Sequence, residues 1–324
     1  MFAGNQTFPA RTPGPDGAPS PLPGLHAPQV VSASRRTDIP ACYPDWLVSR
    51  LRAGWVQCYH PFTGAAHGIS LSPADVVALV LWTHNCGPFL PFLPLLDRMG
   101  YAYYFLHTLT ALPKNLEPGL PDPADLLRAM RQLAERIGAQ RMHWRYDPIV
   151  VTGDLDEAYH LGNFARLANA LEGATERVIM SFVYPYARVV RRLRRANLGW
   201  QDPSPALKTE LTARLAEVAR DHGMRLVSCC PDYPLPENAG PSRCLDPALL
   251  RLLRPDVDSQ YPPGPTRRGC GCARSIDIGA YDTCAHACLY CYATSRPLLA
   301  KRRWQAHSPS SPSLLPPPGG GANP

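Results

Sequence analysis

The amino-acid sequence predicts an α/β fold: a single (β/α) TIM-like barrel with a cysteine-rich C-terminal segment and disordered, proline-rich ends. Short apolar runs without polar alternation are separated by amphipathic helical stretches, which is typical of a parallel sheet buried on both faces. About seven such strands occur over a length suited to one domain. This number favours a barrel over an open doubly wound sheet.

Composition divides the 324 residues into three parts. The chain holds 38 prolines, and both ends are rich in Pro, Gly and Ser. We expect residues 1–28 and 304–324 to be disordered because segments of this composition cannot bury a core. Residues 29–303 are expected to form the barrel, with the cysteine-rich segment 229–294 as a part of it.

The elements of the barrel follow from apolar patterning and from helix start and stop signals. Asp122 and Pro123 read as an N-cap followed by proline at the first helical position, and Gly54, Gly173 and Gly223 end helices. Strands are expected at 30–34, 76–82, 101–109, 142–146, 178–183, 226–229 and 275–278. Helices are expected at 46–53, 122–137, 161–171, 207–218 and 248–253, and a small hairpin at 55–71.

Several function classes lose support at once. Residues 34–37 after the first strand are Ser-Arg-Arg-Thr and not a GxGxxG loop, which argues against a dinucleotide-binding fold. The net charge of +7 permits an anionic or nucleic-acid partner without requiring one. No run approaches the roughly 18 apolar residues of a membrane helix. The N-terminus has no export pattern, so we expect a cytoplasmic protein without membrane contact and with reduced thiols.

Polar residues that directly follow the strands should converge on one face of a barrel. Among them, Arg35, Arg36, Asp38, Arg145 and Asp147 are candidate catalytic residues on a substrate face. The two neighbouring guanidinium groups could clamp a carboxylate or a phosphate. Equally, Asp38 could simply pair with one of the arginines, and Arg145 with Asp147. Further polar residues at strand ends are Thr83, His84, Asn85, His107, Thr110, Tyr184, Cys229, Cys230, Asp277 and Asp282.

Eight of the eleven cysteines lie between residues 229 and 291. In a reducing compartment, clustered cysteines indicate metal ligands or redox groups more than disulfides. Cys284, Cys288 and Cys291 have a C-x3-C-x2-C spacing. Three thiolates this close can bind three irons of a cubane cluster and leave the fourth iron open to a substrate or cofactor.

This spacing, with Tyr290 before the last cysteine, resembles the signature of the radical S-adenosylmethionine superfamily. The resemblance implies a [4Fe–4S] cluster whose open iron binds S-adenosylmethionine, with Tyr290 packing near the adenine. Reduction, by a donor such as a flavodoxin or ferredoxin, would yield methionine and a 5′-deoxyadenosyl radical. In that superfamily the motif follows the first strand. Here it follows the last one, so residues 30–34 would come next in space, as in a circular permutation.

A second resemblance covers most of the core, from about residue 30 to 294. The sequence is similar to a bacterial family known as domain of unknown function 1848 in segments 31–40, 81–83, 144–148, 270–272 and 275–284. The family implies a barrel-like body and a C-terminal cysteine cluster similar to that of the radical S-adenosylmethionine enzymes. It leaves the activity undefined.

The remaining cysteines leave alternatives open. Cys244, Cys270, Cys272 and one of Cys229 and Cys230 are four potential ligands. They could hold a second iron–sulfur cluster or a structural zinc, or they could be reduced thiols without a metal. The scattered cysteines are expected to be ordinary small core residues: Cys42, Cys58 and Cys86.

Two interpretations of function remain. The first is a radical S-adenosylmethionine-like enzyme acting on a small molecule or nucleic acid, with His286 shielding the cluster rather than binding it. The second is a non-catalytic iron–sulfur or zinc module that supports a partner or nucleic acid. Residues 188–195 hold five arginines that could meet phosphates, but without interleaved aromatic residues a solvated helix face is favoured.

Overall fold

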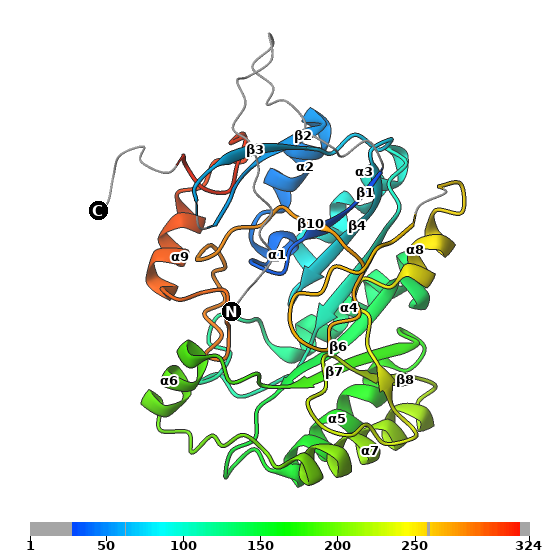
Figure 1. Ribbon diagram of the computed structural model, residues 1–324, viewed down its shortest axis with the longest axis vertical. Helices are drawn as coiled ribbons and strands as arrows, with labels where there is room; N and C mark the ends of the chain where they lie inside the picture. The colour runs from blue at the N-terminus through cyan, green and yellow to red at the C-terminus, as the bar shows by residue number, and fades with distance from the viewer. Residues whose placement is uncertain (1–27, 62, 258–259, 318–324) are drawn as a thin grey trace.

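The computed structural model describes residues 28–61, 63–257 and 260–317. Its centre is a sheet of eight strands in the order β10-β1-β4-β5-β6-β7-β8-β9, and every neighbouring pair is parallel (Figure 1). The strands are β1 (Gln29–Ala33), β4 (Val76–Thr83), β5 (Tyr103–Thr108), β6 (Met142–Ile149), β7 (Arg177–Phe182), β8 (Arg225–Ser228), β9 (Gly240–Pro241) and β10 (Ile276–Asp277). The predicted α/β fold with a large parallel sheet is confirmed. Within the described residues β9 and β10 are the two ends of this sheet, so closure into a barrel stays a prediction.

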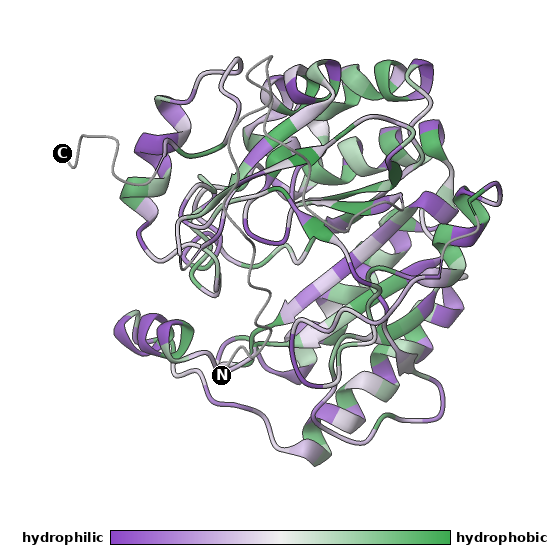
Figure 2. Cartoon of the chain, turned by 45° about the horizontal axis from the view of Figure 1, so that its top comes forward, coloured by the Kyte–Doolittle hydropathy of each residue, from purple (hydrophilic) through white to green (hydrophobic). Residues whose placement is uncertain are grey.

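Both faces of the sheet are covered, which is why its central strands are largely buried. All eight residues of β4 and all six of β5 are buried. One face packs against α4 (Pro123–Ile137), α5 (Glu157–Leu171) and α7 (Pro205–Asp221). The opposite face packs against α8 (Pro247–Leu253) and against the irregular segments around Cys244 and Cys272. In Figure 2 most strands carry hydrophobic colour, one long strand is largely hydrophilic, and the helices show both colours.

The helices begin where polar side chains cap their first turns. Asp122 accepts a hydrogen bond from the amide of Ala124 at the start of α4, and Ser204 accepts one from Leu207 at the start of α7. The other helices are α1 (Ile39–Cys42), α2 (Pro44–Ala53), α3 (Leu93–Arg98), α6 (Ala187–Arg195), α9 (Pro297–Gln305) and the 3-10 helices η1 (Gly87–Phe92) and η2 (Ala139–Arg141). In the part of the chain described, no helix is long and apolar enough to span a membrane.

The predicted hairpin is present as β2 (Trp55–Tyr59) and β3 (Ala66–Ser70), an antiparallel pair separate from the main sheet. The segment after α9, which we expected to be disordered, packs against this part of the fold as far as it is described. The indole of Trp46 donates to the carbonyl of Ser311 at 2.9 Å, the amide of Gln57 donates to that of Pro312 at 2.9 Å, and Leu314 is buried. These apolar and backbone contacts hold residues 306–317 against the fold. Residues 1–27 and 318–324, which complete the two ends expected to be disordered, lie outside the described residues.

The first and last strands of the described chain lie side by side, because β10 pairs with β1 (Figure 1). The Asp277 carboxylate of β10 accepts hydrogen bonds from the Ser32 hydroxyl at 3.0 Å and the Ser34 hydroxyl at 2.6 Å. It also accepts from the amides of Arg35 at 2.8 Å and Gly279 at 2.9 Å. This junction brings the cysteine motif that follows β10 next to the loop that follows β1.

Gly279 is packed so closely against β1 that a larger residue should disrupt the junction. An added Cβ would lie 1.9 Å from Ser34 Oγ and 2.5 Å from Ser34 Cβ, so rotation of the hydroxyl alone cannot relieve the overlap. We expect Gly279→Ala to lower the free energy of unfolding by about 1–3 kcal/mol in urea titrations. Gly153→Ala is the matched control because its Cβ would meet nothing within 4 Å. Equal stability of the two variants would contradict this packing.

Candidate metal centre

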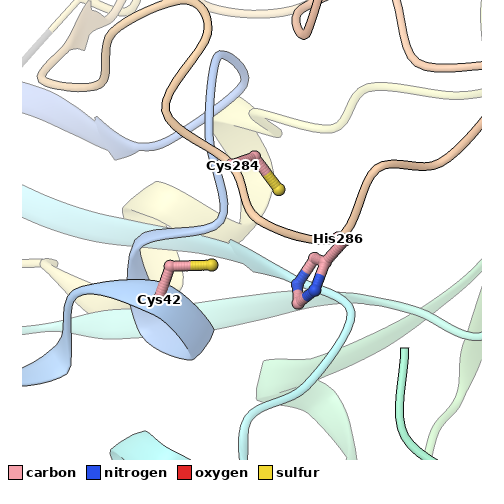
Figure 3. Close-up of side chains that lie close together, drawn as sticks. All are labelled: Cys42, Cys284 and His286. Atoms are coloured by element: carbon pink, nitrogen blue, oxygen red, sulfur yellow. The ribbon is translucent and has the colours of Figure 1, made fainter. Parts of the chain in front are cut away.

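The C-terminal cysteine motif lies beside the end of α1. The ligand atoms of Cys42, Cys284 and His286 all lie within 4.8 Å of one another, and their side chains converge on one point (Figure 3). Cys42 and His286 are buried and Cys284 is half-buried. Two thiols and one imidazole are ligands that zinc and other thiophilic metals take, so this group could hold a metal ion. From its sequence context Cys42 is predicted to be an ordinary core residue, and only the β1–β10 junction places it beside Cys284.

Asp38 fixes the surroundings of this group. Its carboxylate accepts a hydrogen bond from the Ala41 amide at 3.0 Å, which caps α1, and from the His84 amide at 2.7 Å. Its Oδ2 also lies 2.8 Å from Nε2 of His286. The sequence left open a pairing of Asp38 with Arg35 or Arg36. The structure pairs it with the histidine of the cysteine motif instead.

The electrostatics of this pair follow from burial and from mutual contact. Burial alone would lower the pKa of His286, but the nearby Cys284, the hydrogen bond with Asp38 and a second one with the Gly119 backbone raise it to about 9. Burial would raise the pKa of Asp38, and the hydrogen bond and charge of His286 lower it overall. The two groups therefore stabilise each other's charged forms at neutral pH.

The loop between β5 and α4 holds the cysteine segment from the other side. The amide of Leu289 donates to the carbonyl of Leu116 at 2.8 Å, and the amide of Gly119 donates to that of His286 at 3.0 Å. An added Cβ on Gly119 would lie 2.5 Å from the His286 oxygen, so only glycine permits this approach. The cysteine segment is thus fixed by backbone contacts on both sides of Cys288.

Tyr290, the predicted cofactor-binding residue, is buried in an apolar cluster with Cys288, Leu112 and Leu116. Its hydroxyl donates to the carboxylate of Glu117, which is itself buried. Burial raises the pKa of Glu117, while hydrogen bonds from Thr110, Tyr290 and the Leu112 amide partly offset this. Sequence reasoning missed Glu117, since nothing local distinguishes it from a surface glutamate.

The motif thiols are favoured in their neutral form. Burial raises the pKa of Cys288 and of Cys291, and the other motif cysteines add to the effect. For Cys284 the leading cause of the raised pKa is its hydrogen bond with Cys42, followed by burial. Metal binding would therefore release thiol protons, because the thiolate is the ligand.

Arg192 of α6 contributes a positive charge at the motif. Its guanidinium donates to the carbonyl of Cys291 and, at 2.8 Å, to that of Thr294. Arg188 reaches the same segment through the Ser295 hydroxyl at 2.7 Å. We interpreted the arginine run as a solvated helix face. That holds for the exposed Arg191 and Arg194, whereas Arg192 anchors the cysteine segment.

The predicted substrate-face residues are only partly brought together. The guanidinium groups of Arg35 and Arg145 lie 5.6 and 4.8 Å from the centre of the Trp82 ring, so both contact one aromatic residue at the end of β4. Arg145 also pairs with Asp147, and Arg35 donates to the Ser275 hydroxyl at 2.6 Å. Arg36 instead lies over the ring of the exposed Tyr281, at 5.4 Å.

At the carboxyl ends of the strands, several buried polar atoms have no hydrogen-bond partner among the described residues. They belong to the strand ends named in the sequence analysis and to Trp82 itself: Nε of Arg35, Nε1 of Trp82, Nδ1 of His84, Nδ1 of His107 and Nε of Arg145. Buried donors without partners are rare in folded proteins and indicate an ordered water, an ion or a ligand. These atoms thus mark the carboxyl ends of β1, β4, β5 and β6 as the polar face of the sheet.

The remaining candidate ligands form a second group at the β8 and β9 ends. Cys229 Sγ lies 3.8 Å from Cys230 Sγ and 4.0 Å from Cys244 Sγ. Cys270 contacts Cys230 and Cys272, and Cys272 contacts Cys244. Hydrogen bonds from Cys230 and Cys244 lower the pKa of Cys229 despite its burial. The sequence proposed four ligands with Cys229 or Cys230 as alternatives, and the structure brings all five thiols together.

Fold and site together define a parallel α/β protein with two groups of cysteines near its strand ends. The chain belongs to the family described as domain of unknown function (DUF1848), whose model matches residues 30–293. This confirms the family resemblance seen in the sequence, and the family carries no assigned activity.

Similarity to other proteins is weak. No curated protein matches the sequence. Among solved structures, the chain is similar to the crystal structure of a D-hydantoinase, with a TM-score of 0.29, 10% identity and coverage of 63% of this chain and 41% of that one. It is also similar to a structure of the pneumococcal virulence factor StrH, with a TM-score of 0.27, 10% identity and coverage of 68% and 59%. The chain thus spans less than two thirds of either protein.

Breaking the Asp38–His286 pair should be costly, because it leaves a buried imidazolium without its counter-charge. We expect Asp38→Ala to lower the free energy of unfolding by about 3–5 kcal/mol in urea titrations. Asp125→Ala, which removes an exposed pair with Arg128, should cost about 1 kcal/mol or less. A similar small loss in both variants would show that the pair does not hold the loop.

Proposed function

We propose that this protein is a radical S-adenosylmethionine-like enzyme with a [4Fe–4S] cluster on Cys284, Cys288 and Cys291. The observation that carries the proposal is the position of these cysteines. They lie in one fixed loop that directly follows the strand paired with β1. That loop is walled by α1, by the β5–α4 loop and by Arg192.

The donor set fits a cluster better than a single ion. Cysteines that bind a cubane attach to three different irons, so their sulfurs stand farther apart than the ligands of one ion. Among the described residues, the three motif sulfurs do not all lie within 4.8 Å of one another. They are still near enough that Cys284 contributes to the raised pKa of Cys288 and of Cys291. The Ala293 amide donates to Cys291 Sγ at 3.3 Å, the kind of hydrogen bond that tunes cluster sulfurs.

The hydrogen bonds of His286 disfavour a mononuclear Cys42–Cys284–His286 site. Its ring is held by the Asp38 carboxylate on Nε2 and by the Gly119 backbone. A metal bound to the ring would have to displace one of these partners. We therefore assign His286 to positioning the loop, with Asp38 acting through it.

The strand order supports a circularly permuted version of the strand arrangement found in that superfamily. With β10 counted as the first strand, the sheet continues in chain order from β1 through β9. The motif then follows the first strand in space, as in the radical S-adenosylmethionine enzymes. The proposal also includes a barrel-like body. In it, the polar residues at the strand ends near Trp82, such as Arg35 and Arg145, would form the surface that binds the substrate.

When bound, the cluster would supply an open iron that holds S-adenosylmethionine and an electron that cleaves it to methionine and a 5′-deoxyadenosyl radical. The chain's own residues would shape the surroundings. Glu117 fixes the Tyr290 ring through its hydroxyl, so that ring can form one wall of the cofactor site. Arg35 and Arg145, each with an unpartnered Nε, would bind an anionic group of the substrate.

A second candidate function is a non-catalytic iron–sulfur module, and the position of Cys42 favours it. Cys42 forms a hydrogen bond with Cys284, so a fourth thiol stands beside the motif. A cluster with four protein ligands has no open iron and serves electron transfer or structure only. The two candidates therefore differ in the role of one residue.

The enzyme proposal is tested by cofactor cleavage. After anaerobic reconstitution with iron and sulfide, the protein should release 5′-deoxyadenosine from S-adenosylmethionine in the presence of dithionite. Cys288→Ala should lose the product because one cluster ligand is gone. Cys58→Ala, which removes a buried cysteine of the β2–β3 hairpin, should keep it. A colourless protein with stoichiometric zinc would rule the proposal out.

Cys42→Ala separates the two candidate functions. If Cys42 is not a ligand, we expect this variant to keep its iron content and its 5′-deoxyadenosine production. Its reduced cluster should still change its electron paramagnetic resonance signal when S-adenosylmethionine is added. Loss of iron in Cys42→Ala, with no cleavage by the wild type, would instead support the fully ligated module.

A further inference from the structure

We propose that the second group of cysteines binds an iron–sulfur cluster of its own. This group, the cysteine ring, consists of Cys229, Cys230, Cys244, Cys270 and Cys272. It shares no residue with the motif at 284–291, so the inference does not depend on the proposed function.

The ring is closed by contacts between consecutive thiols. Cys229 contacts Cys230 at 3.8 Å and Cys244 at 4.0 Å between sulfurs. The other thiols are neighbours as well, because Cys270 interacts electrostatically with Cys230 and Cys272, and Cys272 with Cys244. All five are free thiols, and the measured separations are far from the roughly 2.05 Å of a disulfide. Five thiols from three separate segments thus lie close together.

The backbone has an unusual conformation at one ring cysteine and directly before another. Cys230 has a φ of +52°, in the left-handed region that non-glycine residues rarely adopt. Gly269, directly before Cys270, has a φ of +78° and packs against the backbone of Cys230. Strained conformations of this kind concentrate at functional sites, where surrounding structure holds them.

The shape of the ring favours a cluster over a single zinc. In a tetrahedral zinc site with a Zn–S distance of about 2.3 Å, every pair of sulfurs is roughly 3.8 Å apart. Here Cys229 lies near this distance from both Cys230 and Cys244. Within the described part of the chain, however, no three of the ring sulfurs all lie within 4.8 Å of one another. Two thiolates that share one iron of a cluster are about as close as the ligands of a zinc ion, and thiolates on different irons are farther apart, so this spacing fits thiolates distributed over more than one iron.

Hydrogen-bond donors surround the ring, as the negative charge of a thiolate-bound cluster requires. The Arg267 guanidinium lies 3.7 Å from Cys229 Sγ and 3.3 Å from the Cys229 carbonyl, and it stacks on Tyr184 at 5.3 Å. The Thr266 hydroxyl lies 3.6 Å from Cys270 Sγ. Such outer contacts set the charge balance and the reduction potential of a cluster.

One side of the ring is closed and the other is accessible. Cys244 and Cys272 are buried in the apolar layer on the second face of the sheet. Cys229 and Cys230 are half-buried and line a small cleft together with Arg267, Tyr184 and Lys208. This is therefore the side from which iron and sulfide would reach the ring.

The test uses the full chain without the first set of ligands. A Cys284→Ala, Cys288→Ala, Cys291→Ala triple variant is reconstituted anaerobically with ferrous iron and sulfide. We expect it to keep iron and sulfide in equal amounts, about two or four of each per chain. Adding Cys244→Ala and Cys272→Ala should reduce both to background. Cys58→Ala serves as the matched control and should keep the full content.

Several outcomes would overturn the proposal. These are a triple variant without iron, or one that takes up one zinc and no sulfide. Cys270→Ala provides a second measurement if the buried substitutions prevent folding, because Cys270 is half-exposed in a loop. In the otherwise wild-type chain it should change the Mössbauer spectrum of one cluster only, and an unchanged spectrum counts against the ring. Failure of the proposed enzyme function would give a different result. The wild type would then release no 5′-deoxyadenosine, while the triple variant would still bind iron and sulfide.

Discussion

The pairing of β1 with β10 is the constraint on which the rest of this structure depends. At the junction, the Asp277 carboxylate accepts hydrogen bonds from two hydroxyl groups and two backbone amides. A single carboxylate thus satisfies donors from the segments that follow β1 and β10 and from β1 itself. Without it, the loop that holds Asp38 and Cys42 would have no fixed relation to a cysteine motif over 240 residues away. The candidate metal-binding group of Cys42, Cys284 and His286 is therefore a product of topology, since its members come from two segments far apart in the sequence.

The Asp38–His286 pair converts this proximity into a defined geometry. A buried ion pair gains little net stability, because desolvation of two charges offsets their attraction. Its value here is positional, since Asp38 is already fixed by the α1 cap and by the His84 amide. The histidine side chain can then take only one place, and the Gly119 contact fixes its backbone. The cysteine loop is thus held before any metal binds.

The sequence was informative wherever the signal is local. Apolar runs located the strands, Asp122 and Pro123 located the start of α4, an apolar repeat located α7, and the spacing of Cys284, Cys288 and Cys291 located the motif. Contacts between distant segments carry no local signal. Cys42 and Cys58 are both buried cysteines near the N-terminus, and only the fold places the first beside Cys284. Glu117, Arg192 and the packing of residues 306–317 escaped prediction for the same reason.

The cysteine ring and the motif are linked by the segment that returns from β9 to β10. This segment carries Cys244 near its start and Cys270 and Cys272 near its end, and it crosses the second face of the sheet. The Ala273 amide donates a hydrogen bond to the Leu245 carbonyl at 3.0 Å, so the start and the end of this segment are bonded to each other. A cluster in the ring would cross-link this return to the end of β8, which restricts where β10 can lie. Since β10 positions the motif at 284–291 against β1, occupancy of the ring would stabilise the geometry of the first site through the backbone, without contact between the two groups.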